Sequence, residues 1–199
     1  MFDYFAKNEV EKQKKFQSNR DKFLMPIVKT VTKFGITANH ITYLSITLFF
    51  IALYFIIQKP ILGFIIGFFY CLLDGLDGPL SRYQNTASKA GSLLDMFADQ
   101  IGVIVLPVAS IIYFGSNEIF AYLFGLFYIV DIFLITILNT LNHRVNFIIR
   151  VKYFYYGLFA LSAYLHLDLL TYFYYVFGIF YTLHSLYLYR ELMKEYKRV

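Results

Sequence analysis

Apolar stretches of near-membrane length follow one another through most of this chain, with only short polar segments between them. A helix that crosses a bilayer needs about 20 mainly apolar residues. Hydrophobic residues make up 59% of the 199 residues and charged residues only 16%, an apolar excess that one soluble core cannot bury. The sequence therefore predicts an all-α integral membrane protein with six transmembrane helices, at residues 41–57, 61–82, 91–114, 118–141, 153–165 and 169–189.

The basic residues predict how these spans are oriented. Six spans place both termini on one side, and the Lys and Arg residues gather in the segments on that side. Lys59 is the only lysine or arginine in the turns on the opposite side. Because basic loops stay in the cytoplasm, we expect a multi-pass protein of the cell membrane with both termini cytoplasmic. Residues 1–38 then form a cytoplasmic segment, and residues 39–199 form the membrane domain.

Residues 20–35 predict an amphipathic helix ahead of the first span. Gly35 is expected to end this helix. Its apolar side chains fall near one helical face: Phe23, Leu24, Ile27, Val28 and Val31. We expect an interfacial helix that lies on the cytoplasmic leaflet.

The remaining composition excludes several classes of function. A single cysteine, Cys71, excludes an internal disulfide framework and a cysteine-rich metal site. The net charge of +5 is typical of cytoplasmic loops that meet lipid headgroups, so membrane lipids are expected partners and nucleic acid is not.

Four aspartates stand in the segment DGLDGPLSRYQNTASKAGSLLDMFAD, residues 74–99. Charged side chains at membrane depth cost about 2.5–3.5 kcal/mol on insertion scales, so they usually serve a function. Asp74 and Asp77 are three residues apart and Asp95 and Asp99 four apart, so each pair can project from one helical face. If the two helices are antiparallel neighbours, the carboxylates converge. Two divalent cations would balance their charge, with Mg²⁺ expected and Mn²⁺ or another divalent ion as alternatives.

The residues around these acids suggest a second ligand. Gly75, Gly78 and Gly91 would let a bulky group approach the backbone. Arg82 can bind phosphate through its planar guanidinium. Ser88 is a suitable cap for the next helix, whose positive end favours anions. Together these features predict a pocket for a pyrophosphate.

The same stretch resembles the CDP-alcohol phosphotransferase family. The family motif is DxxDGxxAR, eight residues, then GxxxDxxxD. Here DGLDGPLSR is followed by YQNTASKA and GSLLDMFAD, with every spacing matched. Ser81 replaces the usual alanine and Pro79 follows Gly78, and both changes bear on how the nucleotide would fit.

The resemblance implies roles for individual residues. Its metal ligands would be Asp74, Asp77, Asp95 and Asp99, and Asp99 would also be the general base. The residues that contact the CDP moiety would be Asp74, Asp77, Gly78, Ser81, Arg82 and Gly91. Asn39, in the segment ITANHIT, is also expected near the nucleotide, with a helix cap as its alternative role.

The implied reaction belongs to phospholipid biosynthesis. The hydroxyl of a small polar alcohol would attack a CDP-linked lipid, CDP-diacylglycerol or CDP-archaeol, and release CMP. The membrane domain would be the catalytic one, its active site would face the cytoplasm, and a homodimer is expected.

The acceptor alcohol is less constrained. Arg144, Arg150 and Lys152 can bind an acceptor phosphate, as in glycerol 3-phosphate or inositol phosphate. Ordinary cytoplasmic positive charge is the favoured explanation of these residues, because every cytoplasmic loop here is basic.

Two other functions compete with this interpretation. An intramembrane prenyltransferase also holds a pyrophosphate on magnesium, although its aspartate motifs lie farther apart in sequence. A divalent-cation transporter could use the acids as a filter.

Overall fold

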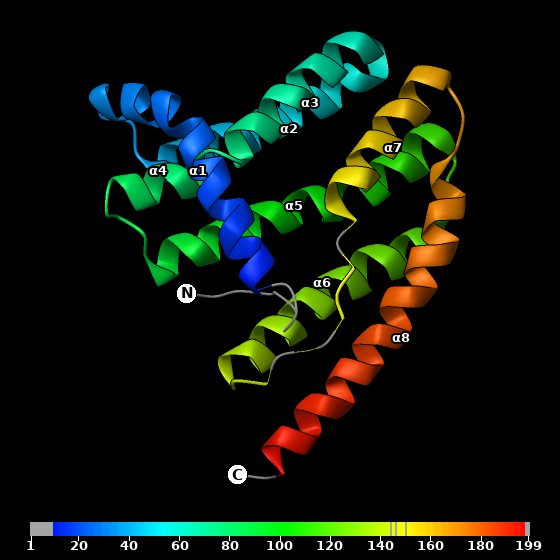
Figure 1. Ribbon diagram of the computed structural model, residues 1–199. Coiled ribbons are helices and arrows are strands. Elements are labelled where there is room, and N and C mark those ends of the chain that lie inside the picture. Colours follow the sequence, from blue (N-terminus) through cyan, green and yellow to red (C-terminus); the bar gives the residue numbers. More distant parts are fainter. Residues whose placement is uncertain (1–9, 144, 146, 150, 198–199) are drawn as a thin grey trace. The chain divides into compact units, whose positions relative to one another are not determined.

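The computed structural model of the chain describes residues 10–143, 145, 147–149 and 151–197, and these contain eight α-helices and no β-strand (Figure 1). The helices belong to two compact units, one that ends at Asp99 and one that begins at Gln100. The boundary between the units falls inside one long helix.

The first unit contains four complete helices and the beginning of a fifth. They are α1 (Val10–Lys33), α2 (Ala38–Gln58), α3 (Pro60–Asp74), α4 (Asp77–Tyr83) and the first part of α5 (Lys89–Phe114). The second unit contains the rest of α5 with α6 (Glu118–Thr140), α7 (Lys152–Leu165) and α8 (Leu170–Tyr196).

Four segments among the described residues are long and apolar enough to cross a membrane. They are Ala38–Gln58, Pro60–Tyr83, Lys89–Phe114 and Glu118–Thr140, and they coincide with the first four predicted spans. The second of them joins α3 and α4. At 14 residues, α7 is shorter than the roughly 20 residues that a perpendicular crossing needs.

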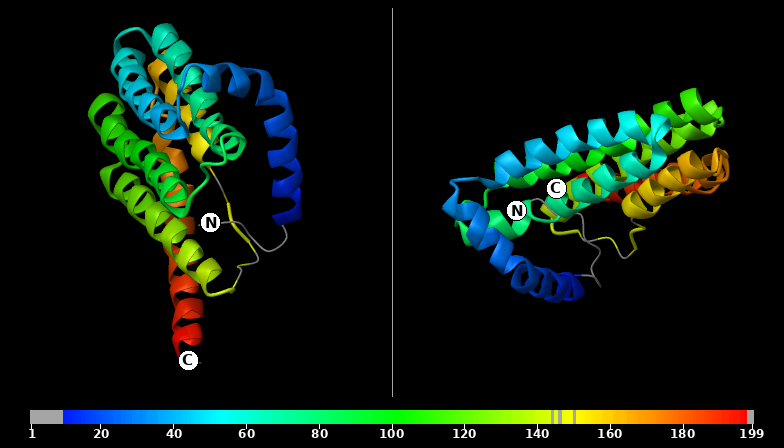
Figure 2. Two further views of the ribbon diagram at one scale, coloured as in Figure 1. Left: turned by 90° about the vertical axis from the view of Figure 1, so that its left-hand side faces the viewer. Right: turned by 90° about the horizontal axis from the view of Figure 1, so that it is seen from above.

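The N-terminal helix differs from its prediction in extent. It begins at Val10, well before residue 20, and it bends part-way along its length (Figures 1 and 2). Pro26 lies inside α1 and removes one backbone hydrogen bond, which accounts for the bend. The predicted end is confirmed, because the helix ends at Lys33 and Gly35, two residues later, adopts a φ of +70°.

The apolar residues of α1 do not share one environment, contrary to the prediction. Leu24, Val28 and Val31 pack on a small core of the first unit, whose other buried members are Ile41, Leu76 and Leu80. Phe23 and Ile27 are 81% and 50% exposed instead. One side of α1 therefore packs on protein, and a neighbouring side presents exposed apolar residues.

The α2–α3 hairpin brings two backbones into close contact. A Cβ atom added to Gly63 of α3 would lie 2.3 Å from the Cα and N atoms of Ile56 of α2. Phe49 and Tyr70 fill the hairpin farther from the turn, with ring centroids 5.5 Å apart. Glycine at position 63 is thus required by space, as is common where membrane helices meet.

Aromatic and polar contacts hold the second unit together. Tyr155 stacks on Phe173, with ring planes 8° apart, and its hydroxyl lies 2.8 Å from that of Tyr174. The buried Asp131 of α6 lies 2.8 Å from Nδ1 of His184 on α8. Asp131 thus has the structural hydrogen-bonding role that is common for a lone acid inside a helix bundle.

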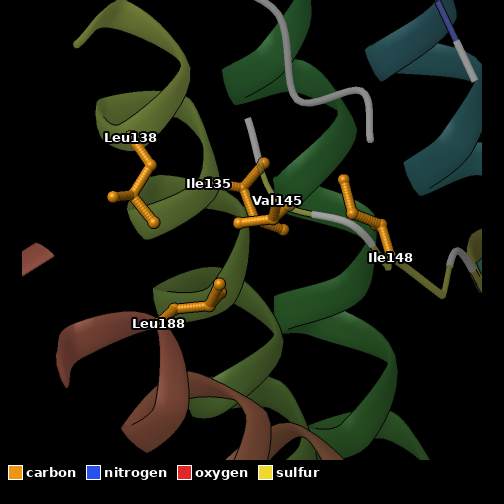
Figure 3. Packing of buried hydrophobic residues seen from close by; sticks show 5 residues of the cluster. All are labelled: Ile135, Leu138, Val145, Ile148 and Leu188. Carbon is orange, nitrogen blue, oxygen red and sulfur yellow. The ribbon is translucent and has the colours of Figure 1, made fainter. Parts of the chain in front are cut away.

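The segment between α6 and α7 is anchored on the same unit. Figure 3 shows Val145 and Ile148 of this segment lying against Ile135 of α6, in a buried cluster that also includes Leu138 and Leu188. The hydroxyl of Tyr181 donates to the carbonyl of Ile149 at 2.8 Å. These contacts attach the connection to α6 and α8.

Candidate active site

Three of the four predicted acids gather in the first unit. Asp74 is the last residue of α3, and Asp95 and Asp99 lie one turn apart on α5. One carboxylate oxygen from each of these residues lies within 4.8 Å of the others. The expected convergence of the two acidic segments is therefore present for these three side chains.

The chemistry of this group suits a hard divalent cation. Three ionised carboxylates at such separations repel one another, and a cation between them would attract each carboxylate and offset that repulsion. Carboxylate oxygens are the ligands that Mg²⁺ and similar ions prefer. The donor set therefore fits the cation that the sequence suggests.

Asp77 is placed differently from the other three acids. Its Oδ2 accepts a hydrogen bond of 2.9 Å from Thr42 Oγ1 on α2, and its Oδ1 accepts one of 2.6 Å from the Gly78 amide. Its side chain is buried and is not part of the three-residue acidic group. Its predicted role as a metal ligand stays a prediction.

A break between α3 and α4 explains this placement. The predicted continuous helix is interrupted at Gly75 and Leu76, where the amide of Leu76 bonds to the carbonyl of Leu73 at 2.8 Å. Pro79 cannot donate to the carbonyl four residues earlier, so the helix loses a bond at this point. Asp74 is therefore the last residue of one helix and Asp77 the first residue of the next.

Arg82 forms a two-pronged ion pair with a residue of α1. Its Nε and Nη2 donate to the two carboxylate oxygens of Asp21 at 2.7 and 2.6 Å. This bidentate geometry is the strongest form of the arginine–carboxylate pair. The ion pair attaches α1 to α4. It uses Nε and Nη2 of Arg82, the arginine that the sequence analysis expected to bind phosphate.

Gly78 faces two guanidinium groups. A Cβ atom added there would lie 3.3 Å from Arg82 Nη1 and 3.3 Å from Arg20 Nη2. Arg20 therefore reaches the same glycine from α1. A side chain at position 78 would have to displace both groups.

The spacing of acids, glycines and arginine corresponds to a known family. A family model described as CDP-alcohol phosphatidyltransferase matches residues 35–190, most of the chain. The chain belongs to the CDP-alcohol phosphatidyltransferase family. A search of curated proteins found no match.

Membership in the CDP-alcohol phosphatidyltransferase family confirms the resemblance seen in the sequence. The protein is a phosphotransferase for substituted phosphate groups and a transferase of phospholipid biosynthesis, in which a headgroup is transferred from a CDP-alcohol. Its membrane helices agree with that membership.

Two further residues of the family motif lie beside Gly78 and at the start of α5. Ser81 donates to the carbonyl of Gly78 at 2.9 Å and is partly exposed. Ser88 Oγ accepts a hydrogen bond of 3.0 Å from the Gly91 amide, which confirms the predicted cap of α5. Contact of Ser81 or Gly91 with a nucleotide stays a prediction.

Asn39 does not cap α2. Thr37 is the cap residue, and His40 completes a capping box with it. The helix-cap alternative for Asn39 is therefore wrong. Asn39 is exposed at the second position of α2, and its predicted contact with the nucleotide is still a prediction.

The three predicted acceptor residues fall in or near the segment between α6 and α7. Arg144 and Arg150 lie outside the described residues. Lys152 begins α7 and is 8% exposed, with its ammonium 5.2 Å from the centre of the Tyr153 ring. Its phosphate-binding role stays a prediction.

The sequence interpretation overlooked contributions from α1 and α2. Arg20 and Asp21 of α1 were not assigned any role, and Thr42 was not paired with Asp77. One sequence signal for Asp21 was available: it is an acid between Arg20 and Lys22 in a strongly basic segment. Neither the pattern of α1 nor that of α2 indicates which residue of the acidic segment each would contact.

Proposed function

We propose that this protein transfers a phosphatidyl-type group from a CDP-linked lipid to the hydroxyl of a small polar alcohol and releases CMP. CDP-diacylglycerol and CDP-archaeol are the candidate lipids. The observation that carries the proposal is the acidic group of Asp74, Asp95 and Asp99, on two helices of a chain with this family's motif.

The aspartates would hold two divalent cations, Mg²⁺ by preference. Asp74, Asp95 and Asp99 supply oxygens that already lie close together. Asp77 would join them by turning one oxygen away from its present donors, Thr42 or Gly78. Bound cations would neutralise the negative charge that develops on the CMP leaving group.

The proposed chemical step forms one bond to phosphorus and breaks another. The acceptor oxygen bonds to the β-phosphorus of the CDP-linked lipid while the bond from that phosphorus to the CMP oxygen breaks. The hydroxyl proton passes to the carboxylate of Asp99, which would act as the general base. The product is a lipid with a phosphodiester-linked headgroup.

The nucleotide would lie over the surface formed by the family motif. Its contacts would come from Asp74, Asp77, Gly78, Ser81, Arg82, Gly91 and Asn39. The absence of a Cβ at Gly78 and the two guanidinium groups beside it support this assignment.

The acceptor is proposed to be phosphorylated, with glycerol 3-phosphate and inositol phosphate as candidates. Arg144, Arg150 and Lys152 would bind its phosphate. The support is the clustering of basic residues in one short connection.

The proposed membrane arrangement has six spans, cytoplasmic termini and an active site at the cytoplasmic face of the cell membrane. Its support is the distribution of basic residues along the chain. We propose that α1 lies at the interface, where exposed Phe23 and Ile27 could enter the leaflet. A homodimer completes the proposal.

Family membership favours this reaction over a prenyltransferase or a cation transporter. A transporter would carry divalent cations into liposomes without any nucleotide. The transferase would need the CDP-linked lipid and an acceptor for any turnover.

An acceptor panel tests the proposed function. Purified full-length protein is given radiolabelled CDP-diacylglycerol or CDP-archaeol with glycerol 3-phosphate, inositol 1-phosphate, inositol, glycerol or serine. We expect CMP and a labelled phosphodiester lipid with a phosphorylated acceptor, loss of both in EDTA, and recovery with excess Mg²⁺.

Two results of the panel would count against the proposal. Failure to release CMP from either lipid with every acceptor would contradict the proposed reaction. If an unphosphorylated alcohol were the sole acceptor, the reaction would stand and the phosphate-binding role of Arg144, Arg150 and Lys152 would fall.

A further inference from the structure

The residues beside Gly78 include a cation that the family motif does not contain. Arg20 belongs to α1, whereas the family match begins at residue 35. Its Nη2 and the Nη1 of Arg82 both lie within 3.3 Å of the point that a Gly78 Cβ would occupy. The two nitrogens are therefore at most twice that distance apart, beside a motif glycine.

The two arginines differ in the donors that they have to offer. Arg82 already gives Nε and Nη2 to the carboxylate of Asp21. Arg20 has a buried Nε with no hydrogen-bond partner among the described residues. A buried donor without an acceptor is unfavourable, more so when it is charged, and such groups usually have a partner. The unpaired Nε favours an anionic ligand beside Arg20, whose Nη2 is the atom that lies over Gly78.

The charge around Gly78 defines the chemistry of that ligand. Arg20 and Arg82 contribute two positive charges. The acids beside them are Asp21, which is paired with Arg82, and Asp77, whose Oδ1 accepts from the Gly78 amide, so Arg20 is the one cation of these four residues without a paired acid among them. The planar, charged guanidinium group of an arginine is well suited to bind phosphate oxygens. The site therefore suits a phosphate group.

The ion pair of Asp21 helps to fix the neighbouring Arg20 beside Gly78. The Asp21–Arg82 ion pair attaches α1 to α4 at the residue next to Arg20. The packing of Val28 against Leu76 and Leu80 attaches the same helix farther along. Arg20 is thus held over Gly78 by neighbours on both elements, which favours a fixed binding role over a mobile surface charge.

We propose that Arg20 binds a phosphate oxygen of the CDP-linked lipid, and that the Asp21–Arg82 pair positions it for this role. The proposal rests on the proposed function for the identity of the substrate. It assigns substrate binding to α1, outside the family match. It also assigns to Arg82 a positioning role through Asp21, in addition to any contact of its own.

Binding of CDP to the purified full-length protein in detergent with Mg²⁺ tests the proposal. The variant is Arg20→Gln, and its matched control is Lys22→Gln, which removes the same charge from an exposed residue on another side of α1. We expect Arg20→Gln to weaken CDP binding by about 10- to 100-fold, as for loss of a hydrogen bond to a charged group. Cytidine, which has no phosphate, should bind both variants equally, and Lys22→Gln should bind CDP like the wild type.

Steady-state kinetics give a second readout. In Arg20→Gln the KM for the CDP-linked lipid should rise by a similar factor, with a smaller change in kcat and an unchanged KM for the acceptor. Arg20→Lys restores the charge but lacks an Nε, so its KM should fall between those of the wild type and Arg20→Gln. If Arg20→Gln does not fold, Arg20→Lys decides, because a wild-type affinity for CDP in that variant would overturn the proposal.

A bulk lipid headgroup is the other source of a phosphate. The variants are therefore also assayed in nanodiscs of phosphatidylcholine alone and with phosphatidylglycerol. An effect of Arg20→Gln that appears only with phosphatidylglycerol, together with unchanged CDP binding, would overturn the proposal. If the wild type binds CDP through Arg20 but releases no CMP, this inference stands and the proposed reaction fails.

Discussion

At the scale of single residues, Asp77 has hydrogen-bond donors of its own beside the group formed by the other three acids. Asp74, Asp95 and Asp99 turn toward one another, whereas Asp77 accepts from Thr42 and from the backbone. From the motif spacing alone, Asp74 and Asp77 are expected to act as a pair of equivalent ligands. The helix break at Gly75 and Leu76 falls between them, and Asp77 is buried whereas Asp74 is partly exposed.

The hydrogen bond from Thr42 is expected to orient the carboxylate of Asp77. Thr42→Val keeps the shape of the side chain and removes the donor, so CMP release should fall by about 10- to 100-fold, as for partners of metal ligands. Thr42→Ser should recover most of the activity. The control is Thr47→Val, an exposed threonine of the same helix that bonds only to the carbonyl of Tyr43 among the described residues. Equal activities of the two valine variants would exclude this role for Thr42.

The proposed base can be separated from the binding role of the same residue. Asp99→Asn keeps an oxygen ligand but cannot accept the hydroxyl proton, so turnover should fall by about 10²- to 10⁴-fold. Binding of the CDP-linked lipid should be retained. CMP release and a direct binding assay on the same preparation measure the two quantities. An Asp99→Asn enzyme with unchanged turnover would remove the assignment of the base.

At the scale of helices, α1 is attached to the site through its own side chains. It contributes Asp21 to Arg82, Val28 to the small core and Arg20 to the surface over Gly78. A helix predicted to lie on the leaflet thus also packs on the catalytic motif. The same helix leaves Phe23 and Ile27 exposed, so packing on protein and contact with lipid use different sides of it.

The α2–α3 hairpin allows a test at this scale. Gly63→Ala would place a Cβ atom 2.3 Å from backbone atoms of Ile56, so the helices must separate. We expect it to lower the free energy of unfolding by about 1–3 kcal/mol or more, the range for overpacking. Gly67→Ala is the control one turn later, where the nearest atom is the Ala52 Cβ at 3.9 Å. Thermal unfolding in detergent compares the two, and equal stability would contradict the close approach.

At the scale of the whole chain, the first compact unit contains the acidic group and the motif glycines, and the second is built around aromatic residues of α6, α7 and α8. The first four spans were predictable because each is a long apolar run. The last two were less well determined by hydropathy, since α7 is short and the end of α8 contains several charged residues.

The sequence by itself determined the family motif, the first four apolar helices and the spacing that allows each acidic pair to project from one helical face. These features depend on spacing within a helix and on the cost of charge beside lipid, both of which are local to the chain. Only the tertiary structure decided that Asp77 pairs with Thr42, 35 residues away, and Arg82 with Asp21, 61 residues away. Helical periodicity shows which side chains share a face, but the partner of that face depends on how separate helices pack, which no local pattern specifies.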